Sequence, residues 1–461
     1  MNATAAAIPH QGQQGVTLPN AFVYAVTAYT LVSMGRIHEI VRALGPLRLG
    51  LLSGVLVCAL AFTAIRRDVL RAIFASPVTK GLMIVVAFTV LTIPTGVWPK
   101  ASFNYLTKTY YNAVLLFIVT AAIFADRRAA RFLITSLVVG VMVAGAIALL
   151  RSTPGRFEIG LTYDANETAA LFTLTIPWAI YLVLTEKGWP RYVALLALPI
   201  CALGILKTGS RGGLLSVGAL VPFLLVLAPP KRRAPFILFV VAGAIVTALS
   251  MGDQAVYRLR KAFDTTEYNY TTRDGRIEIW KRGLGYVKGS PILGVGMDGF
   301  QYKELESKQN IGFGVRQAAA HNMYLQVAAE LGLIGFSGFM TMLIGGQIVG
   351  IRARKRAKEL IARGGGREAD RDLLRANMAQ AALFSIMCTG FFLSLGYSSM
   401  VYFACAAPIG VLLSTMTSGG PPNTPVQAAP QQQRVRGMRG WRSARPWPAG
   451  AGVHGMSTPP R

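Results

Sequence analysis

Long apolar segments alternate with short polar gaps along most of the chain, from Pro19 to Thr417. Most of these segments approach the roughly 20 residues with which a helix crosses about 30 Å of hydrocarbon. The pattern therefore predicts an all-α integral membrane protein with about twelve transmembrane helices. The predicted spans are residues 20–35, 47–65, 81–97, 112–125, 132–150, 167–185, 191–206, 212–228, 235–251, 323–350, 376–395 and 397–417.

Two segments depart from this pattern. Residues 252–322, between the ninth and tenth predicted spans, mix eight acidic with eleven basic side chains and carry several aromatic residues. We expect a small folded loop subdomain there, with an interfacial helix. From Ser418 onward the chain is rich in Pro, Gly, Gln and Arg, a composition that predicts a disordered basic tail. The apolar stripe of the expected interfacial helix is Ile277, Ile279, Trp280, Leu284 and Val287, flanked by Arg276, Lys281, Arg282 and Lys288.

Composition excludes an ordinary soluble enzyme. Of 461 residues, 53% are hydrophobic and only 15% are charged, well below the roughly 25% charge of soluble domains. The net charge of +27 would indicate a nucleic-acid partner in a soluble chain. Here the basic residues lie mostly in gaps between apolar segments, so we predict contact with membrane lipids and no nucleic-acid partner.

The distribution of basic residues predicts the orientation. With the N-terminus inside, 27 of the 47 Lys and Arg residues fall in inner segments, nine in short outer gaps and eleven in the long gap. Short cytoplasmic loops are the ones enriched in Lys and Arg. We therefore expect both termini and residues 351–375 in the cytoplasm, with residues 252–322 on the outer side.

Cofactor and metal chemistry leave no signature in the sequence. The four cysteines, Cys58, Cys201, Cys388 and Cys405, all lie in apolar segments without a CxxC spacing, which predicts small buried hydrophobic side chains rather than a disulfide or zinc site. There is also no Walker motif or glycine-rich βαβ signature. We expect no metal site and no cofactor.

A polar hairpin, residues 207–213, separates two long apolar spans and holds Lys207, Arg211 and three glycines. One interpretation is an anion site, in which glycine N–H groups approach phosphate oxygens and Arg211 supplies a bidentate donor at a helix N-terminus. The other is a turn whose cations reach the membrane interface. The residues alone leave both open.

His321 follows three alanines and opens a long apolar span on the predicted outer side. A helix N-terminus disfavours imidazolium, so a neutral His321 could act as a general base. The alternative is an interfacial histidine without a role. Glu330 is nine residues further on, about half a turn around an ideal helix, so we expect it to pack or cap rather than orient His321.

Other polar residues fall on the same predicted side. Arg273, Arg276 and Trp280 lie in the long loop, where a solvated face is the simpler explanation of the cations. Asp164 and Asn166 stand at the outer entry of the span 167–185, where Asp164 is expected to cap the helix.

These motifs, in this order, resemble the O-antigen ligase and polymerase superfamily of membrane glycosyltransferases. The resemblance covers roughly residues 20–417. It is carried by the Gly-Ser-Arg-Gly-Gly hairpin, Arg276-Ile277-Glu278-Ile279-Trp280, residues 290–296 (Ser-Pro-Ile-Leu-Gly-Val-Gly), His321-Asn322-x-x-Leu325 and Glu330-x-Gly332.

The resemblance implies a periplasmic enzyme of the bacterial inner membrane. In O-antigen ligases a glycan passes from undecaprenyl pyrophosphate to the lipid A core of lipopolysaccharide, without metal or ATP. Arg211 and Arg276 match the family's two functional arginines and His321 its loop histidine. We predict His321 as catalytic base and Arg211, Arg276 and Lys207 as pyrophosphate ligands. The supporting candidates are Asn166, Asp164, Arg273, Asn322 and Glu330.

This interpretation divides the chain into five parts. They are a cytoplasmic N-terminus (1–19), nine transmembrane helices (20–251), a periplasmic catalytic loop (252–322), three further transmembrane helices (323–417) and the cytoplasmic tail (418–461).

Two alternatives stay open at the level of sequence. A polymerase or a protein O-oligosaccharyltransferase of the same superfamily would share the donor site and differ in acceptor. A lipid-linked glycan transporter belongs to another class; it would place functional charges deep within spans and is commonly built from repeated halves. The predicted spans are almost free of ionisable residues and no internal repeat is evident, which disfavours the transporter.

Overall fold

The structure is a computed structural model, and its described residues are 15–40, 44, 47–151, 157–228, 233, 275–309 and 318–417. The chain divides into two units, Met1–Gly420 and Pro421–Arg461. Everything described below belongs to the first unit. The predicted span 235–251, Arg273 and the predicted tail lie outside the described residues.

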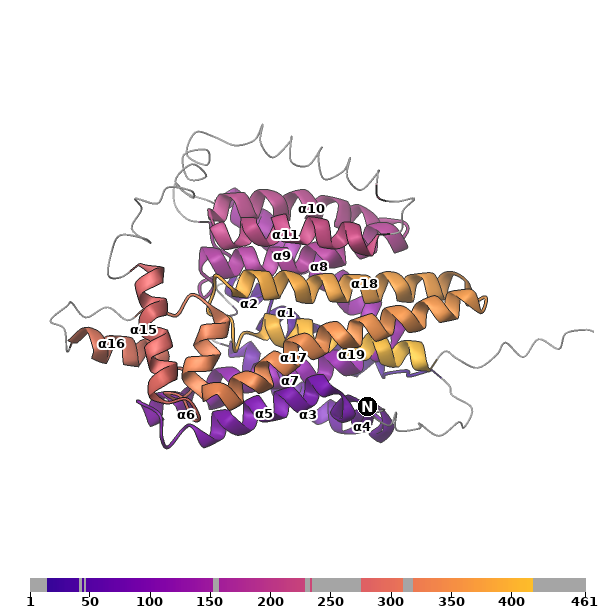
Figure 1. The fold of residues 1–461 in the computed structure, drawn as a ribbon. Coiled ribbons are helices and arrows are strands. Elements are labelled where there is room, and N and C mark those ends of the chain that lie inside the picture. The colour runs from indigo at the N-terminus through magenta and orange to yellow at the C-terminus, as the bar shows by residue number, and fades with distance from the viewer. Residues whose placement is uncertain are drawn as a thin grey trace, which may run out of the picture. The chain divides into compact units, whose positions relative to one another are not determined.

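The described residues form helices and connecting loops, and no strand occurs among them, which confirms the all-α prediction. The helices run largely side by side in a bundle, with α15 and α16 at one end (Figure 1). Their bounds are α1 Asn20–Ser33, α2 Ile37–Ile40, α3 Leu49–Ala64, α4 Arg67–Ala75, α5 Pro77–Leu91, α6 Pro99–Tyr105, η2 Leu106–Tyr110, α7 Tyr111–Ala125, α8 Arg127–Arg151, α9 Ala165–Thr185, α10 Trp189–Thr208, α11 Arg211–Leu227, α15 Arg276–Gly289, α16 Phe300–Gln309, α17 Met323–Ala362, α18 Gly366–Gly390 and α19 Ser399–Met416.

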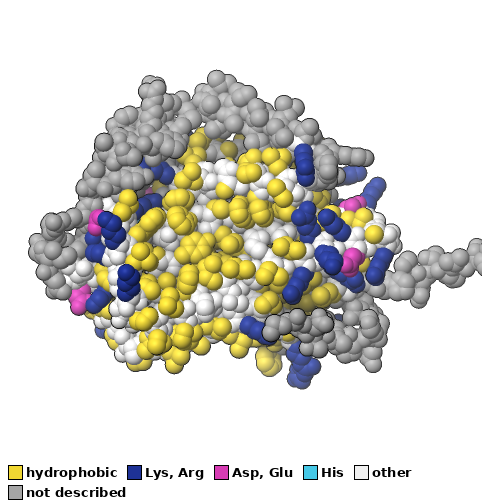
Figure 2. Space-filling model, in the orientation of Figure 1, with side chains coloured by type: hydrophobic (Ala, Val, Ile, Leu, Met, Phe, Trp, Pro, Cys, Tyr) yellow, Lys and Arg dark blue, Asp and Glu magenta, His cyan; other side chains and the backbone are white. Residues whose placement is uncertain are grey.

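Six of the described helices are long and apolar enough to cross a membrane, or seven if the bent pair α3 and α4 forms one span. Every predicted span other than 235–251 coincides with a helix, although several of these helices are shorter or more polar than the six. The count of twelve therefore stays a prediction. Figure 2 shows hydrophobic side chains over the middle of the bundle and Lys and Arg side chains towards its two ends, as a membrane-spanning protein requires.

Small residues set the closest helix contacts in the bundle. A Cβ atom on Gly81 of α5 would lie 2.6 Å from the carbonyl oxygen of Gly338 in α17. On α19, a Cβ on Gly410 would lie 2.3 Å from the carbonyl oxygen of Ala121 in α7. Between membrane helices, where apolar side chains gain little by leaving lipid, such close backbone approach is a main source of attraction.

The bundle has two ends that differ in their helix termini. We call the end where α9, α11, α17 and α19 begin the motif end, because the sequence motifs meet there. The opposite end is where α9, α11 and α17 finish and where α18 begins.

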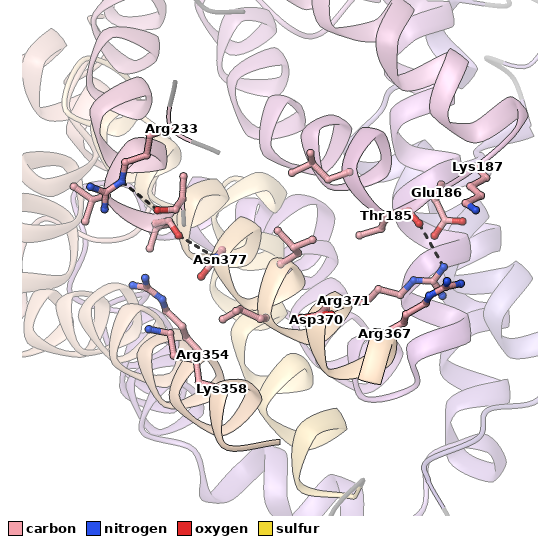
Figure 3. Close-up of a pocket in the computed structure, with 16 residues that line it drawn as sticks. Thr185, Glu186, Lys187, Arg233, Arg354, Lys358, Arg367, Asp370, Arg371 and Asn377 are labelled. Atoms are coloured by element: carbon pink, nitrogen blue, oxygen red, sulfur yellow. Dashed lines mark hydrogen bonds between the residues drawn. The ribbon is translucent and has the colours of Figure 1, made fainter. Parts of the chain in front are cut away.

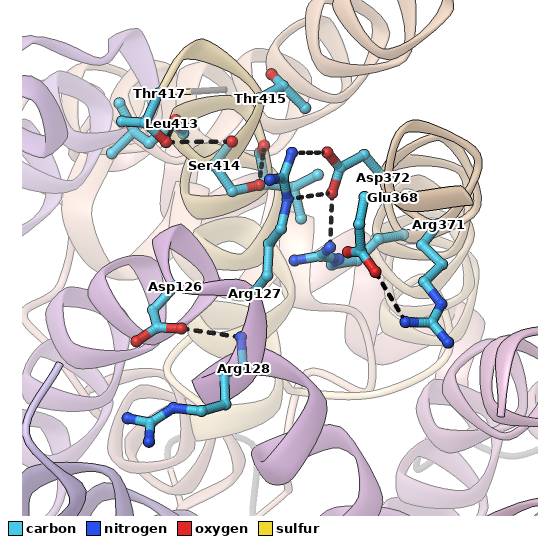
Figure 4. Close-up of polar contacts among 12 residues, drawn as sticks. Asp126, Arg127, Arg128, Glu368, Arg371, Asp372, Leu413, Ser414, Thr415 and Thr417 are labelled. Carbon is cyan, nitrogen blue, oxygen red and sulfur yellow. Dashed lines mark hydrogen bonds and ion pairs between the residues drawn. The ribbon is translucent and has the colours of Figure 1, made fainter. Parts of the chain in front are cut away.

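A buried ion network ties helices together at the opposite end (Figure 4). Asp372 of α18 is fully buried, pairs with Arg127 at the start of α8, and accepts a hydrogen bond from Arg375 at 2.6 Å. Arg375 is itself only 2% exposed. Each charge needs the others, because a buried charge without a partner is strongly destabilising.

The loop subdomain contains the expected helix, α15, but its apolar stripe does not act as one face. Ile279 is buried, and Trp280 and Val287 pack with it against Phe300 of α16 and Leu325 of α17. Ile277 and Leu284 remain 39% and 55% exposed. The helix therefore uses part of the stripe for packing and leaves part outside.

Two of the four cysteines also depart from the expected burial, Cys58 fully and Cys388 in part. Cys58 is exposed on α3, whereas Cys201 and Cys405 are buried and Cys388 is intermediate. An apolar helix facing lipid can leave a small hydrophobic side chain uncovered by protein.

Candidate functional site

The segment 290–296 docks into a break in α17. Gly332 has φ 67° and ψ −178° inside this helix, a backbone conformation that only glycine adopts readily. A Cβ at Gly332 would also lie 2.2 Å from the carbonyl oxygen of Ile292. The break frees backbone groups that pair across the junction: Val295 N–H donates to Ala329 O (2.8 Å), Gly296 N–H to Glu330 O (2.9 Å) and Leu333 N–H to Pro291 O (2.8 Å).

Glu330 supports the same junction. Its side chain is buried, and one carboxylate oxygen accepts a hydrogen bond from the N–H of Phe300, the first residue of α16, at 3.2 Å. A carboxylate at a helix start satisfies an otherwise unpaired backbone donor. Glu330 therefore packs and caps, as its distance from His321 along the helix led us to expect.

The hairpin between α10 and α11 is a tight turn with an internal cap. Gly209 closes α10 in a left-handed conformation, and the hydroxyl of Ser210 accepts a hydrogen bond from Gly213 N–H at 3.2 Å. Arg211 is the first residue of α11 and is partly buried, while Lys207 in the last turn of α10 is exposed. The turn thus presents both cations at the motif end.

Two glycines of this hairpin lie in close packing contacts. Gly212 and Gly213 are buried. A Cβ at Gly212 would lie 2.7 Å from Cβ of Phe392, and one at Gly213 would lie 2.7 Å from Cβ of Ala169 in α9. The glycines let the start of α11 approach these segments closely, and the anion site at this hairpin stays a prediction.

The start of α9 is held by a complete capping box. The Asp164 carboxylate accepts from the N–H groups of Asn166 and Glu167, both at 2.8 Å, and the Glu167 carboxylate accepts from Asp164 N–H at 3.2 Å. The side-chain amide of Asn166 also donates to Asp164, at 3.3 Å. The expected cap at Asp164 is confirmed, and it occupies Asn166 as well.

The loop before Asp164 is fixed from α2. One oxygen of the Glu39 carboxylate accepts from Leu161 N–H at 2.8 Å and from Thr162 N–H at 2.9 Å. Burial opposes ionisation of Glu39, but these hydrogen bonds and the nearby Arg36 charge outweigh it and lower its pKa. Nothing in the sequence had marked Glu39.

His321 lies directly before the cap of α17. Its φ is 47°, and its backbone N–H donates to the Ser394 hydroxyl at 2.8 Å. Burial lowers the pKa of the imidazole below the ordinary 6.5, the positive charge of Arg276 lowers it further, and Asp164 opposes this. Neutral imidazole is therefore the favoured form near pH 7, and the field of the Arg276 and Asp164 charges reaches it.

Asn322 explains why His321 has this position. Its side-chain oxygen accepts from Tyr324 N–H at 2.9 Å and from Leu325 N–H at 3.0 Å, so Asn322 is the N-cap of α17. A cap side chain that bonds the second and third helical N–H groups fixes where the helix begins. In the His-Asn motif, Asn322 builds the helix start and leaves the His321 ring available for chemistry.

Residues 391–398, which join α18 to α19, connect the motifs to one another. Phe391 meets the Trp280 ring edge to face at 5.8 Å, and the Trp280 indole N–H donates to Ala320 O at 2.9 Å, next to His321. Phe392 packs on the hairpin glycine, as described above. Sequence reasoning missed this segment, because the predicted spans 376–395 and 397–417 cover all of it except Gly396.

The hydrogen bond from Trp280 to Ala320 thus holds α15, which begins at Arg276, beside His321, and the charges of Arg276 and Asp164 affect the pKa of His321. Arg211 lies at the same end of the bundle, because its neighbour Gly212 contacts Phe392 of the segment 391–398. Arg273 lies outside the described residues. No three His, Cys, Asp or Glu side chains within the described ranges are grouped as metal ligands.

Comparison with known proteins gives a family model and two relatives. The model of the O-antigen ligase family matches residues 194–340. An uncharacterised protein of Haemophilus influenzae is 23% identical over 226 residues, which is 44% of this chain and 55% of that protein. The exopolysaccharide production protein ExoQ of Rhizobium meliloti is 25% identical over 279 residues, 56% of this chain and 62% of ExoQ.

The matched regions span less than two thirds of either relative. The family match itself begins in α10 and ends in α17. It therefore contains the hairpin with Arg211, the start of α15 with Arg276, the segment 290–296, His321 and the break at Gly332. Residues 194–340 are thus similar to the O-antigen ligase family, and the family resemblance that the motifs indicated is confirmed over these residues.

Proposed function

We propose that the protein is a membrane glycosyltransferase that moves a glycan from undecaprenyl pyrophosphate to the lipid A core of lipopolysaccharide. The observation that carries this proposal is the contact of α15, which begins at Arg276, with Ala320 beside His321 at the motif end, where Arg211 also lies. A base beside phosphate-binding cations is the combination that such a transfer needs.

In this reaction the hydroxyl oxygen of the acceptor attacks the anomeric carbon of the donor. The bond from that carbon to the phosphate oxygen breaks, and undecaprenyl pyrophosphate leaves with the electron pair. His321 takes the hydroxyl proton and later releases it to water. A single displacement of this kind inverts the anomeric centre.

Arg211 and Arg276 stabilise the charge that develops on the leaving pyrophosphate, and Lys207 assists from the end of α10. Two guanidinium groups can supply the positive charge that a divalent metal supplies elsewhere. The proposal is therefore metal-independent. The start of α9, with Asp164 and Asn166, and the cap at Asn322 hold the surrounding backbone in place.

The motif end faces the periplasm in this proposal and the protein lies in the bacterial inner membrane. Membrane-impermeant maleimide on intact cells tests this, with Cys58 replaced by serine. Lys281→Cys in α15 should be labelled from outside, and Lys355→Cys in α17 only after the membrane is opened. The reverse pattern would overturn the orientation.

The likeness to ExoQ, an exopolysaccharide production protein, favours a second candidate, a polymerase of the same superfamily; a protein O-oligosaccharyltransferase differs only in its acceptor. A lipopolysaccharide gel of a deletion strain separates them. Loss of the long-chain ladder with accumulation of unattached polymer supports the ligase. A core bearing a single repeat supports the polymerase, and normal lipopolysaccharide with an unmodified glycoprotein supports the oligosaccharyltransferase.

A further inference from the structure

A basic cavity of about 980 Å³ lies at the opposite end of the bundle from His321 (Figure 3). It is lined by the end of α9, the end of α11, the last third of α17 and the first half of α18. Nothing in the proposed transfer uses it.

The charge in this cavity is strongly unbalanced. Six cations line it against two carboxylates, Glu186 and Asp370. Arg371 is held by Glu368 and by the carbonyl of Thr185, at 2.9 Å and 3.4 Å. Within the described part of the chain, no ion pair joins the others to an acid, which leaves their charge for a ligand. The six cations are Lys187, Arg233, Arg354, Lys358, Arg367 and Arg371.

Three polar atoms in the lining lack a hydrogen-bond partner within the described residues: Asn377 Oδ1, Arg354 Nε and Glu186 Oε1. Asn377 is 3% exposed, and its amide nitrogen donates to Leu227 O at 3.3 Å, but its side-chain oxygen accepts nothing. The buried Nε of Arg354 likewise donates to nothing. A buried unpaired polar atom is costly, so the lining offers one donor, on Arg354, and two acceptors, on Asn377 and Glu186, to a ligand.

The cavity is also apolar where it meets the spanning part of the helices. Leu184 of α9 and Val226 of α11 are 45% and 68% exposed, and Leu373 and Leu374 of α18 also line it. Both exposed residues stand in the last turns of apolar helices, at the level where acyl chains meet headgroups.

We propose that this cavity binds an anionic phospholipid whose headgroup carries a hydroxyl, such as phosphatidylglycerol. The phosphate lies among Arg354, Lys358 and Arg367, the headgroup hydroxyl donates to the Asn377 side-chain oxygen, and an acyl chain covers Leu184 and Val226. Basic pockets between transmembrane helices hold anionic lipid headgroups in this way.

Lipid adducts on the purified protein, counted by native mass spectrometry, test the proposal. Phosphatidylglycerol should bind more tightly than phosphatidylcholine with the same acyl chains. The double variant Arg354→Gln and Lys358→Gln should bind phosphatidylglycerol about 30-fold more weakly, because each such cation is worth roughly a factor of five. Equal binding of the two lipids by the unmodified protein would refute the site.

A matched control lies on the same helix. Arg352→Gln with Lys355→Gln removes the same charge from exposed positions of α17 outside the cavity lining, and should change binding by less than about threefold. Equal loss in both double variants would reduce the effect to general attraction of anions and overturn the proposal.

Two further binding measurements identify the ligand. Soluble glycerol phosphate should bind much more weakly than the lipid, and equal affinity would assign the site to a free phosphate instead. Asn377→Leu should weaken phosphatidylglycerol but not phosphatidic acid, which has no headgroup hydroxyl. Equal weakening of both lipids would remove Asn377 from the contact. All readouts are binding, so they stand or fall independently of transfer activity.

Discussion

The two ends of the helix bundle both concentrate cations, but they differ in the helix starts that surround the two proposed sites. At the motif end, α9, α11, α17 and α19 each begin with a side-chain cap, from Asp164, Ser210, Asn322 and Ser398. Beside the cavity at the opposite end, α10 and α18 begin at Gly188 and Gly365 without one, although Ser76 and Asp126 cap α5 and α8, which do not line the cavity. Capped helix starts hold a few side chains in defined places, which a reaction requires and a lipid-binding surface does not.

The electrostatics of the two ends differ in the same sense. The N-termini gathered at the motif end carry the positive ends of the helix dipoles and favour anions. The end of α9 and the end of α11 bring negative dipole ends to the cavity, where Lys and Arg side chains compensate them. We therefore expect cations at the motif end to govern turnover, and those at the opposite end to govern lipid binding and stability.

The largest expected effect is loss of transfer at the motif end. Arg211→Ala and Arg276→Ala should each abolish activity while the protein still inserts, and Arg211→Lys should be poor because an ammonium cannot form the bidentate contact with phosphate. Activity should be unchanged in excess EDTA. The measurement is ladder formation on lipopolysaccharide gels. The control is Arg354→Gln with Lys358→Gln, which should keep its activity; near-normal activity of both alanine variants would remove the arginines from the donor site.

The second-largest effect is expected when His321, the proposed base, is replaced. His321→Ala should lose about 10²- to 10⁴-fold in rate, the usual contribution of acid–base catalysis, with donor binding nearly kept. His321→Glu should recover part of the lost rate and His321→Gln should not, because a carboxylate can accept a proton and an amide cannot. If His321→Gln equals the unmodified enzyme from pH 5 to pH 9, His321 only positions the acceptor. Weakened donor affinity in His321→Ala would instead assign it to the pyrophosphate.

The third prediction compares the loss of a buried charge with the loss of an exposed charge, by their effects on the free energy of unfolding. Asp372→Ala leaves Arg375 buried without a partner and should lower the free energy of unfolding by about 3–5 kcal/mol. The control, Glu368→Ala, removes an exposed partner of Arg371 and should cost about 0–1 kcal/mol. Denaturant titration in detergent measures both. Equal values would mean that the network is solvated.

The smallest effect is a shift in titration. Because burial and the Arg276 charge hold the pKa of His321 below 6.5, activity should persist below pH 6.5 and fall as the pH drops through that pKa. Arg276→Gln should raise the pKa of His321, and Asp164→Asn should lower it. NMR titration of histidine ring signals, independent of turnover, follows both changes. Shifts of the same sign in the two variants would contradict the proposed proximity.

Hydropathy was sufficient to locate the long apolar helices among the described residues. The apolar segments coincide with described helices because a bilayer demands about 20 apolar residues per crossing whatever the neighbours are. Local capping was also readable: Asp164 lies at the start of α9 because capping depends only on residues within one turn. The hairpin, the loop histidine and the loop arginine were all recognised from the chain, because motifs are local in sequence.

Only the tertiary structure decided which residues lie next to these motifs. No local pattern shows that Ser394 holds His321, that residues 290–296 fill the break at Gly332, or that the hairpin glycines receive Phe392 and Ala169. The basic cavity likewise joins four helices whose cations looked like ordinary loop charges in sequence. Helix partners in a membrane are chosen by the fit of small and large side chains across hundreds of residues, so spans and motifs can be read one at a time while the site they form cannot.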